Sequence, residues 1–266
     1  CRSEIAVGDH VAVVWAPIDN DGIKKWHFKR NVDPQVKRRK VLCEWVDAGL
    51  HELKHVCDSV ESKRSEEGMV YELRRRAHGD NVDLAVVESA RVVVGSEGVV
   101  RCWHEFVVPE GLNDLPRLGV RMVLPGDLEV FEWFGRGPEE NYADRKAGYA
   151  IGRYRSTVSK QYVPYIMPQE HGNKTDVRWL SLRDEAGFGL LISCDTLVEA
   201  NVSRYSAEQI TQAWHTTDLS PEPVVHVHLD VAQRGLGTAS CGPDTLPKYR
   251  IGPGRYVLGY RVSPLG

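Results

Sequence analysis

The polar side chains that could do chemistry gather in four irregular stretches of the chain. These are 16–22 (APIDNDG), 135–142 (GRGPEENY), 168–173 (PQEHGN) and 235–244 (GLGTASCGPD). Each is rich in residues typical of turns, and a rigid scaffold usually presents its binding or catalytic groups on such connections. We therefore take these four stretches as the places where function is expected.

Two of the stretches contain acid/base candidates. Glu139 and Glu140 could supply the two carboxyl groups of a glycosidase, but adjacent residues of an extended chain point to opposite sides and cannot flank one bond. A turn that caps a strand explains them better. Glu170 and His171 could share proton transfer at a sugar carbon. They are also adjacent, so we expect buried structural hydrogen bonding there, and the residues alone predict no catalytic group.

Metal and nucleophile chemistry have weaker support. The oxygen-bearing residues of 16–22 lack the twelfth-position Glu of an EF-hand, so an Asx-rich turn is expected instead of a calcium site. His226 and His228 lie on one side of a strand without a visible third ligand, which predicts an exposed strand face and no metal. Cys241 has no neighbouring His to activate it. Two interpretations of Cys241 remain equally open: it forms part of a pocket wall, or it is a plain buried cysteine.

The elements that must position these stretches are predicted to be antiparallel strands. From about Glu52 onward, short apolar or alternating segments recur about every dozen residues. Turn residues separate them and no ten-residue helix intervenes, a pattern typical of an all-β sandwich. The segments are 52–58, 69–77, 83–94, 99–108, 117–124, 128–134, 177–183, 188–194, 197–204, 224–232 and 255–262. Turns are expected at 79–81 and at 95–98.

Two short helices should interrupt the strands. The first spans 33–49, where Asp33-Pro34 supplies an N-cap and a first-turn proline, apolar residues recur on one face, and Gly49 ends the run. The second begins at Ser206, which has capping-box spacing to Gln209. No repeat or linker divides the chain, so residues 1–266 are predicted to form one domain.

Composition excludes several function classes. The 266 residues carry a formal net charge of −3, which favours neither nucleic acid nor an anionic membrane surface as a partner. No apolar run approaches the roughly 20 residues of a membrane span. Six cysteines without C-x-x-C spacing indicate reduced, mostly buried thiols and a cytoplasmic protein. The start at Cys1 indicates a chain cut from something longer.

The sequence resembles the small-chain, or fifth, domain of the glycoside hydrolase family 2 β-galactosidases, of the LacZ type. The matching pieces are 15–22 (WAPIDNDG), 133–145 (WFGRGPEENYADR), 162–173 (YVPYIMPQEHGN), 201–206 (NVSRYS) and the 235–247 loop. Their order and spacing cover nearly the whole chain. The resemblance implies a large antiparallel β-supersandwich, galactose mutarotase-like in fold, which packs against a catalytic (β/α)8 barrel.

The resemblance also implies an activity. Members hydrolyse terminal β-D-galactosides such as lactose with retention, using two Glu carboxyl groups about 5 Å apart. Those groups belong to the barrel, so no glutamate of this chain inherits the role and the chain alone is expected to be inactive. The expected partners are the galactoside and the barrel domain or large subunit. Intact members are expected to be homo-oligomers and commonly use Mg and Na, but no cofactor is expected in this chain.

The resemblance implies that this chain contributes accessory residues to the active site. Asn20, Asp21 and Gly22 would lie beside the galactose, and a mobile loop over about 23–29 would act as a gate. In the late Gly-x-Gly loop, Cys241 takes the place of a tryptophan that stacks on the leaving-group sugar in many members. We therefore expect altered recognition of the leaving group, and altered transglycosylation.

Two alternatives stay open, and one departure from the family is expected. The chain could be a free-standing galactoside-binding module, or a mutarotase-like enzyme that uses Glu170 and His171. Only about a dozen residues precede the 15–22 segment, where members have several strands. This predicts an N-terminally truncated sandwich with an unpaired edge.

Overall fold

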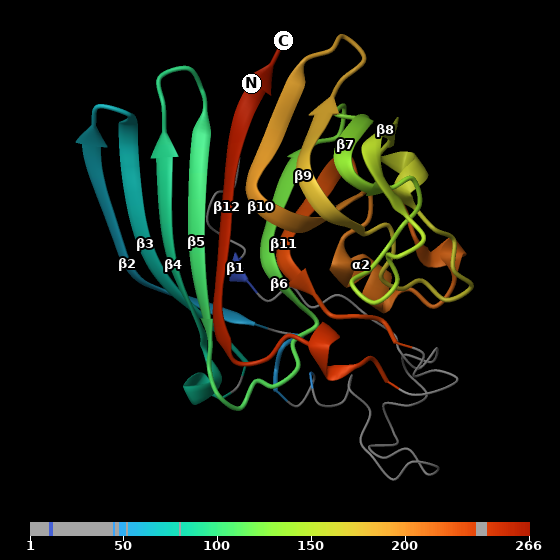
Figure 1. Cartoon of the computed structure of the whole chain (residues 1–266), viewed down its shortest axis with the longest axis horizontal. Helices are drawn as coiled ribbons and strands as arrows, with labels where there is room; N and C mark the ends of the chain where they lie inside the picture. Colours follow the sequence, from blue (N-terminus) through green and yellow to red (C-terminus); the bar gives the residue numbers. More distant parts are fainter. Residues whose placement is uncertain (1–10, 13–44, 46–47, 52, 80, 238–243) are drawn as a thin grey trace.

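The structure is a computed structural model, and it describes residues 11–12, 45, 48–51, 53–79, 81–237 and 244–266 (Figure 1). Almost all of these residues lie in antiparallel strands or in the turns that join them. The helix predicted over 33–49 lies outside the described residues except for Trp45 and 48–49. The all-β antiparallel class is confirmed, whereas the single domain stays a prediction.

Twelve strands are linked by hydrogen bonds in one sheet. The main path runs β1-β6-β11-β10-β12-β5-β4-β3-β2, and β9 also pairs with β10 and carries β7 and β8 (Figure 1). The strands are β1 (Val11–Ala12), β2 (Lys54–Ser65), β3 (Gly68–His78), β4 (Val86–Val94), β5 (Val100–Val108), β6 (Arg117–Pro125), β7 (Val130–Gly137), β8 (Ala150–Thr157), β9 (Lys174–Arg183), β10 (Gly189–Ser203), β11 (Val224–Gln233) and β12 (Gly254–Leu265).

The period-two pattern of side chains explains why these segments form strands. In β5, Cys102 and Phe106 face the interior while Trp103 and Val107 are exposed, as expected where one face of a strand packs on the core. The inward side chains of most strands meet in one hydrophobic cluster, which includes the almost fully enclosed Trp133. Each buried large apolar side chain contributes about 1.5–3 kcal/mol relative to leaving it exposed. This cluster holds the curved sheet together.

Most predicted strands are confirmed, with three differences. The strand predicted over 52–58 continues to Ser65 as β2. The segments 188–194 and 197–204 form a single strand, β10, whose register shifts between Ser193 and Val198 and again before Ala200. The polar Asp195-Thr196 pair separated the two predicted segments, but a bulge keeps the strand continuous while its pairing passes from β12 to β11. The strand β8 was missed. Among the strands that the structure describes it pairs only with β7, and its outward polar residues give no burial signal.

The turn predicted at 95–98 and the helix start predicted at Ser206 are confirmed, but only half of the predicted capping box forms. At 95–98 the Gly95 N–H donates to the carbonyl of Val99 at 2.8 Å, which closes the β4–β5 hairpin. The helix α2 (Ala207–Gln212) begins after Ser206, whose side chain accepts the Gln209 N–H. The reciprocal half of the capping box is absent, because the Ser206 N–H donates to Glu222 instead.

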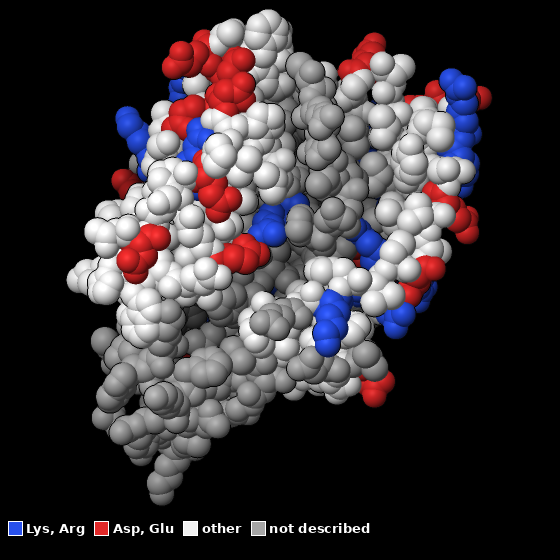
Figure 2. Space-filling view, turned by 180° about the vertical axis from the view of Figure 1, so that it is seen from behind, with Lys and Arg blue, Asp and Glu red and all other residues white. Residues whose placement is uncertain are grey.

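The described surface carries both signs of charge. Figure 2 shows basic and acidic side chains intermixed on the reverse side of the molecule, with neither sign gathered into one large area. Within the described part of the chain, no helix is long and apolar enough to cross a membrane.

Candidate functional site

The four residues predicted to bind substrate, Asn20, Asp21, Gly22 and Cys241, lie outside the described residues. Both flanks of the segment that contains Cys241 are described, however. These flanks are residues 235–237 and 244–247.

Asp144 fastens both ends of the late loop. Its carboxylate accepts hydrogen bonds from the backbone N–H groups of Leu236 at 3.1 Å and Gly237 at 2.7 Å, and from the Thr245 hydroxyl at 3.0 Å. Gly237 has φ of +67°, and a Cβ there would lie 2.5 Å from the Thr245 nitrogen. Only glycine fits this close approach without strain. The loop thus leaves and re-enters the fold at one fixed point.

A buried arginine reinforces the same point. Arg234, directly after β11, donates to both oxygens of Asp114 at 2.7 and 3.0 Å and to both oxygens of Asp244 at 2.9 and 2.8 Å. Arg250 adds a 3.1 Å bond to Asp244. Burial opposes the charge of Arg234, but its two carboxylate partners raise its pKa overall. The late loop is therefore bound to β11 by charge-assisted hydrogen bonds, which are stronger than neutral ones.

Glu140 joins the 135–142 stretch to the 168–173 stretch. Its carboxylate accepts from the Tyr165 hydroxyl, from Arg145 at 2.7 Å and from the Gly172 N–H at 2.8 Å. Burial acts to raise the pKa of this carboxyl, but the three donors lower it below its usual value. A carboxylate held ionised by so many donors fixes a loop and is poorly suited to donate a proton.

The neighbouring asparagines bind the same two stretches. Asn141 accepts both the N–H and the hydroxyl of Thr175, at 2.9 and 2.5 Å, and Asn173 donates to the Asn141 carbonyl at 3.0 Å. Asn141 and Asn173 are completely enclosed. The two stretches that sequence analysis singled out separately are thus one interlocked unit.

Glu170 and His171 belong to a buried structural network, as predicted. Glu170 accepts from Arg117 at 3.4 Å and from Asn201 at 3.3 Å, and the His171 ring contacts the Gln169 carbonyl at 2.9 Å. Arg117 itself binds Asp230 through two nitrogens, at 3.0 and 2.5 Å.

Sequence reasoning missed the Arg117–Asp230 pair, because its members are 113 positions apart. One signal was present: Asp230 is an acidic residue in a strand of mostly apolar residues, and a charge in such a place requires a buried partner. Burial raises the pKa of the Asp230 carboxyl even though Arg117 acts to lower it. The pair connects β6 to β11 at the end of the sheet that carries the loops.

Two further buried groups titrate far from their ordinary ranges. Burial raises the pKa of the Glu199 carboxyl to about 8; the residue as a whole is half-buried, but its carboxyl end accepts the Asn173 amide at 2.7 Å inside the fold. Burial lowers the pKa of Lys174 to about 8, with nearby Glu140 opposing the shift. Both groups therefore change charge near neutral pH.

The prediction of an exposed face at His226 and His228 was wrong. Both are buried, 5% and 4% exposed, because β11 lies between β6 and β10 and is covered on both faces. His226 contacts Glu222 at 3.0 Å. In the residues that the structure describes, no group of three or more His, Cys, Asp or Glu side chains is placed to hold a metal ion.

The described cysteines are free thiols, but not all are buried as predicted. Cys102 is buried and Cys194 is half-buried, and desolvation raises the pKa of their thiols to about 11 and about 12. Cys57 is exposed on β2. The two thiols with raised pKa values are poor nucleophiles at neutral pH.

Known proteins resemble this chain over most of its length. A β-galactosidase of Aeromonas hydrophila is 32% identical over 258 residues, which cover 94% of this chain and 23% of that protein. A β-galactosidase of an Arthrobacter species is 29% identical over 261 residues, which cover 93% of this chain and 25% of that protein. The chain thus spans about a quarter of the length of these relatives.

Solved structures are similar only in outline. A putative aldose 1-epimerase of Escherichia coli covers 77% of this chain and 68% of its own, with a TM-score of 0.39 and 8% sequence identity. A galactose mutarotase related enzyme of Lactobacillus acidophilus covers 77% of this chain and 71% of its own, with a TM-score of 0.37 and 10% sequence identity. Likenesses this low support no argument about activity. The family assignment rests on sequence: residues 4–262 match the family described as beta galactosidase small chain, and the chain therefore belongs to that family.

Proposed function

We propose that this chain is an accessory part of a β-galactosidase, which completes an active site whose catalytic carboxyl groups lie in a barrel outside this sequence. The enzyme would hydrolyse terminal β-D-galactosides such as lactose with retention of configuration. The barrel would be the chain's main partner, and the assembled enzyme would be a cytoplasmic homo-oligomer that uses Mg and Na. Family membership and the shared length with the named relatives support this proposal.

The observation that carries the proposal is the fastening of the late loop at Asp144 and Arg234. The two residues that flank this loop, Gly237 and Asp244, are held by hydrogen bonds to Asp144 and from Arg234, and this supports a fixed place for the ends of the loop. Under the proposal Cys241 forms part of the wall around the leaving-group sugar, and Asn20, Asp21 and Gly22 lie beside the galactose at the start of a gate.

The mutarotase-like alternative has less support. Glu170 would have to exchange protons with a sugar, yet its two oxygens accept from Asn201 and Arg117 inside the fold. A general base must reach the proton that it removes. Faster anomer interconversion by the purified chain would revive this alternative.

Reconstitution with the cognate barrel-bearing part tests the proposal directly. We expect galactoside hydrolysis from the mixture and none from either part alone. A stable complex without activity, or no complex with the cognate part, would overturn the proposal.

A substitution at Cys241 tests the pocket wall. Cys241→Trp restores an aromatic platform, so we expect a lower KM for lactose and more transglycosylation, with little change for a galactoside that has a small leaving group. Cys57→Trp, on the exposed face of β2, is the matched control. Equal behaviour of the two variants would remove Cys241 from the site.

A further inference from the structure

A hollow on the sheet lies apart from the loops described above. Two adjoining cavities of about 540 and 710 Å³ share Arg91 and Trp103 and draw their walls from β2, β3, β4, β5, β10 and β12. Pockets for small molecules typically have about 300–1,000 Å³. We call the two cavities together the Trp103 groove.

An exposed aromatic ring stands at the centre of this groove. Register places Trp103 of β5 opposite Arg91 of β4 and Gly259 of β12. Trp103 is 41% exposed, although most large apolar residues of the strands are buried. A ring presented in this way offers a flat apolar surface with a donor N–H at its edge.

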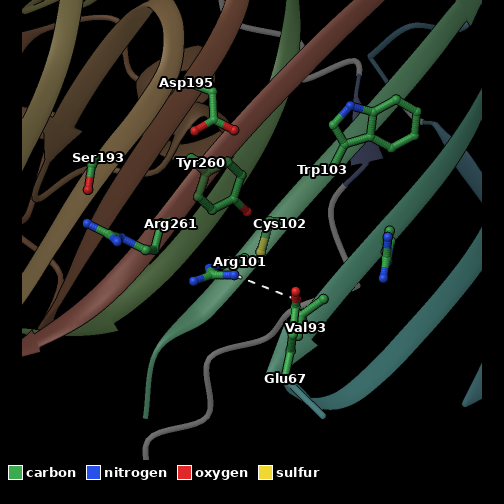
Figure 3. Close-up of a pocket in the computed structure, with 10 residues that line it drawn as sticks. Glu67, Val93, Arg101, Cys102, Trp103, Ser193, Asp195, Tyr260 and Arg261 are labelled. Carbon is green, nitrogen blue, oxygen red and sulfur yellow. Dashed lines mark ion pairs between the residues drawn. The ribbon is translucent and has the colours of Figure 1, made fainter. Parts of the chain in front are cut away.

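A notch lies beside the ring. The carboxylate of Asp195, on β10, lies close above Gly259, because a Cβ added to this glycine would be 2.4 Å from an Asp195 carboxylate oxygen. Figure 3 shows Trp103 and Asp195 on opposite sides of the hollow, with Arg101 and Arg261 below them. A ligand seated over Gly259 would touch both the indole face and the carboxylate.

The groove has equal numbers of positive and negative side chains, and some of them have no partner among the described residues. Four arginines and four carboxylates line it: Arg74, Arg91, Arg101, Arg261, Glu61, Glu67, Glu72 and Asp195. Arg101 lies 3.6 Å from Glu67. Within the described part of the chain, Arg91, Arg261 and Asp195 make no side-chain hydrogen bond or ion pair. Their donors and acceptors are free to meet a ligand.

This chemistry separates the classes of ligand. The centre of a protein interface is depleted of acidic side chains, whereas four carboxylates line this groove. A nucleic acid requires an excess of basic residues, which the groove lacks. A neutral sugar has an apolar ring face that stacks on an aromatic ring, and hydroxyl groups that both donate and accept. We propose that the Trp103 groove binds a neutral oligosaccharide, as a site separate from the loops that Asp144 and Arg234 fasten.

Calorimetric titration of the chain tests the proposal, with β-1,4-linked galactotetraose and cellotetraose as neutral probes and tetragalacturonate as an acidic one. We expect saturable binding of a neutral probe, and about tenfold weaker binding by Trp103→Ala. Trp214→Ala is the matched control, because Trp214 is equally exposed at 41% but does not line the groove. Its affinity should equal that of the unmodified chain.

Three results would overturn the proposal: no saturation with either neutral probe, an unchanged affinity in Trp103→Ala, or binding of the acidic probe alone. Trp103→Phe should recover part of the affinity lost in Trp103→Ala, and thermal unfolding confirms that each variant is folded. Hydrolysis by the reconstituted enzyme should be the same in Trp103→Ala and the unmodified chain. The two proposals can therefore fail separately. Failure of reconstitution would not contradict oligosaccharide binding in the Trp103 groove, and failure of oligosaccharide binding would not contradict the accessory role in a β-galactosidase.

Discussion

The loop-bearing end of the sheet and the Trp103 groove use charged residues in opposite ways. At the loop end Arg117, Arg234 and Asp230 are fully enclosed, and hydrogen-bonded ion pairs of 2.5–3.0 Å hold them. In the groove Arg91 and Arg261 are exposed and make no ion pair with any described residue. A buried charge must be paired or it destabilises the fold, whereas a solvated charge needs no partner.

This contrast indicates what each region is built to do. Paired and buried charges fix the places where loops leave the sheet, so the ends of these loops keep one position in the fold. Unpaired and solvated charges around an exposed indole keep their hydrogen-bonding capacity. Substitutions at the loop end should therefore mainly lower stability, whereas substitutions in the Trp103 groove should mainly lower affinity for a ligand.

The largest expected effect is that of Arg117→Met. The substitution leaves Asp230 and Glu170 as buried carboxylates without their cation, which should lower the free energy of unfolding by about 3–5 kcal/mol. Urea denaturation measures the loss. Arg101→Met, which removes an exposed partner of Glu67 at 3.6 Å, should change stability by less than about 1 kcal/mol. Equal losses would remove the distinction between the two regions.

A stabilising change is expected from Glu199→Gln above mildly acidic pH. The ordinary pKa of a glutamate is near 4.5, whereas that of Glu199 in the fold is about 8. Between these values the folded state keeps a proton that the unfolded state has lost, so stability falls as pH rises, by on the order of 1 kcal/mol per pH unit.

The variant cannot titrate at position 199 and should lack this slope. Denaturation curves at pH 5, 6, 7 and 8 should therefore show an advantage for Glu199→Gln that grows with pH. Parallel curves for the two proteins would show that Glu199 is ionised in the fold at neutral pH.

A smaller loss is expected from Asp144→Asn. Asparagine keeps one acceptor oxygen, so its NH2 group must face the N–H of either Leu236 or Gly237, which costs about 1–2 kcal/mol of stability. The reconstituted enzyme should lose activity beyond what this loss explains, because the late loop would no longer be fixed. Asp184→Asn, which affects an exposed hairpin bond to the Phe188 N–H, is the matched control and should keep full activity.

The smallest effect on stability is expected in the groove. Arg91→Gln and Arg261→Gln break no ion pair among the described residues, so the free energy of unfolding should stay within about 0.5 kcal/mol. Affinity for a neutral tetrasaccharide should nevertheless fall several-fold. A loss of stability without a loss of affinity would show that these arginines serve the fold.

The sequence permitted most of the strands and the cap of α2 to be predicted, because alternation and turn residues are local signals. It did not reveal β8, whose edge position leaves polar residues on its outward face, or the continuity of β10 through a polar pair. His226 and His228 were assigned to an exposed face because sequence does not tell how many neighbours a strand has. The network of Arg117, Asp230 and Glu170 could not be predicted, since its members come from separate strands and loops.

What the sequence alone determined is the all-β antiparallel class, the importance of the stretches around Glu140 and Glu170, and membership of the β-galactosidase small-chain family. Local periodicity and motif order suffice for these. Only the tertiary structure decided that Asp144 and Arg234 fasten the late loop and that Trp103, Gly259 and Asp195 line one groove. Sheet pairing and burial bring distant residues together, and which residues meet is a property of the whole fold.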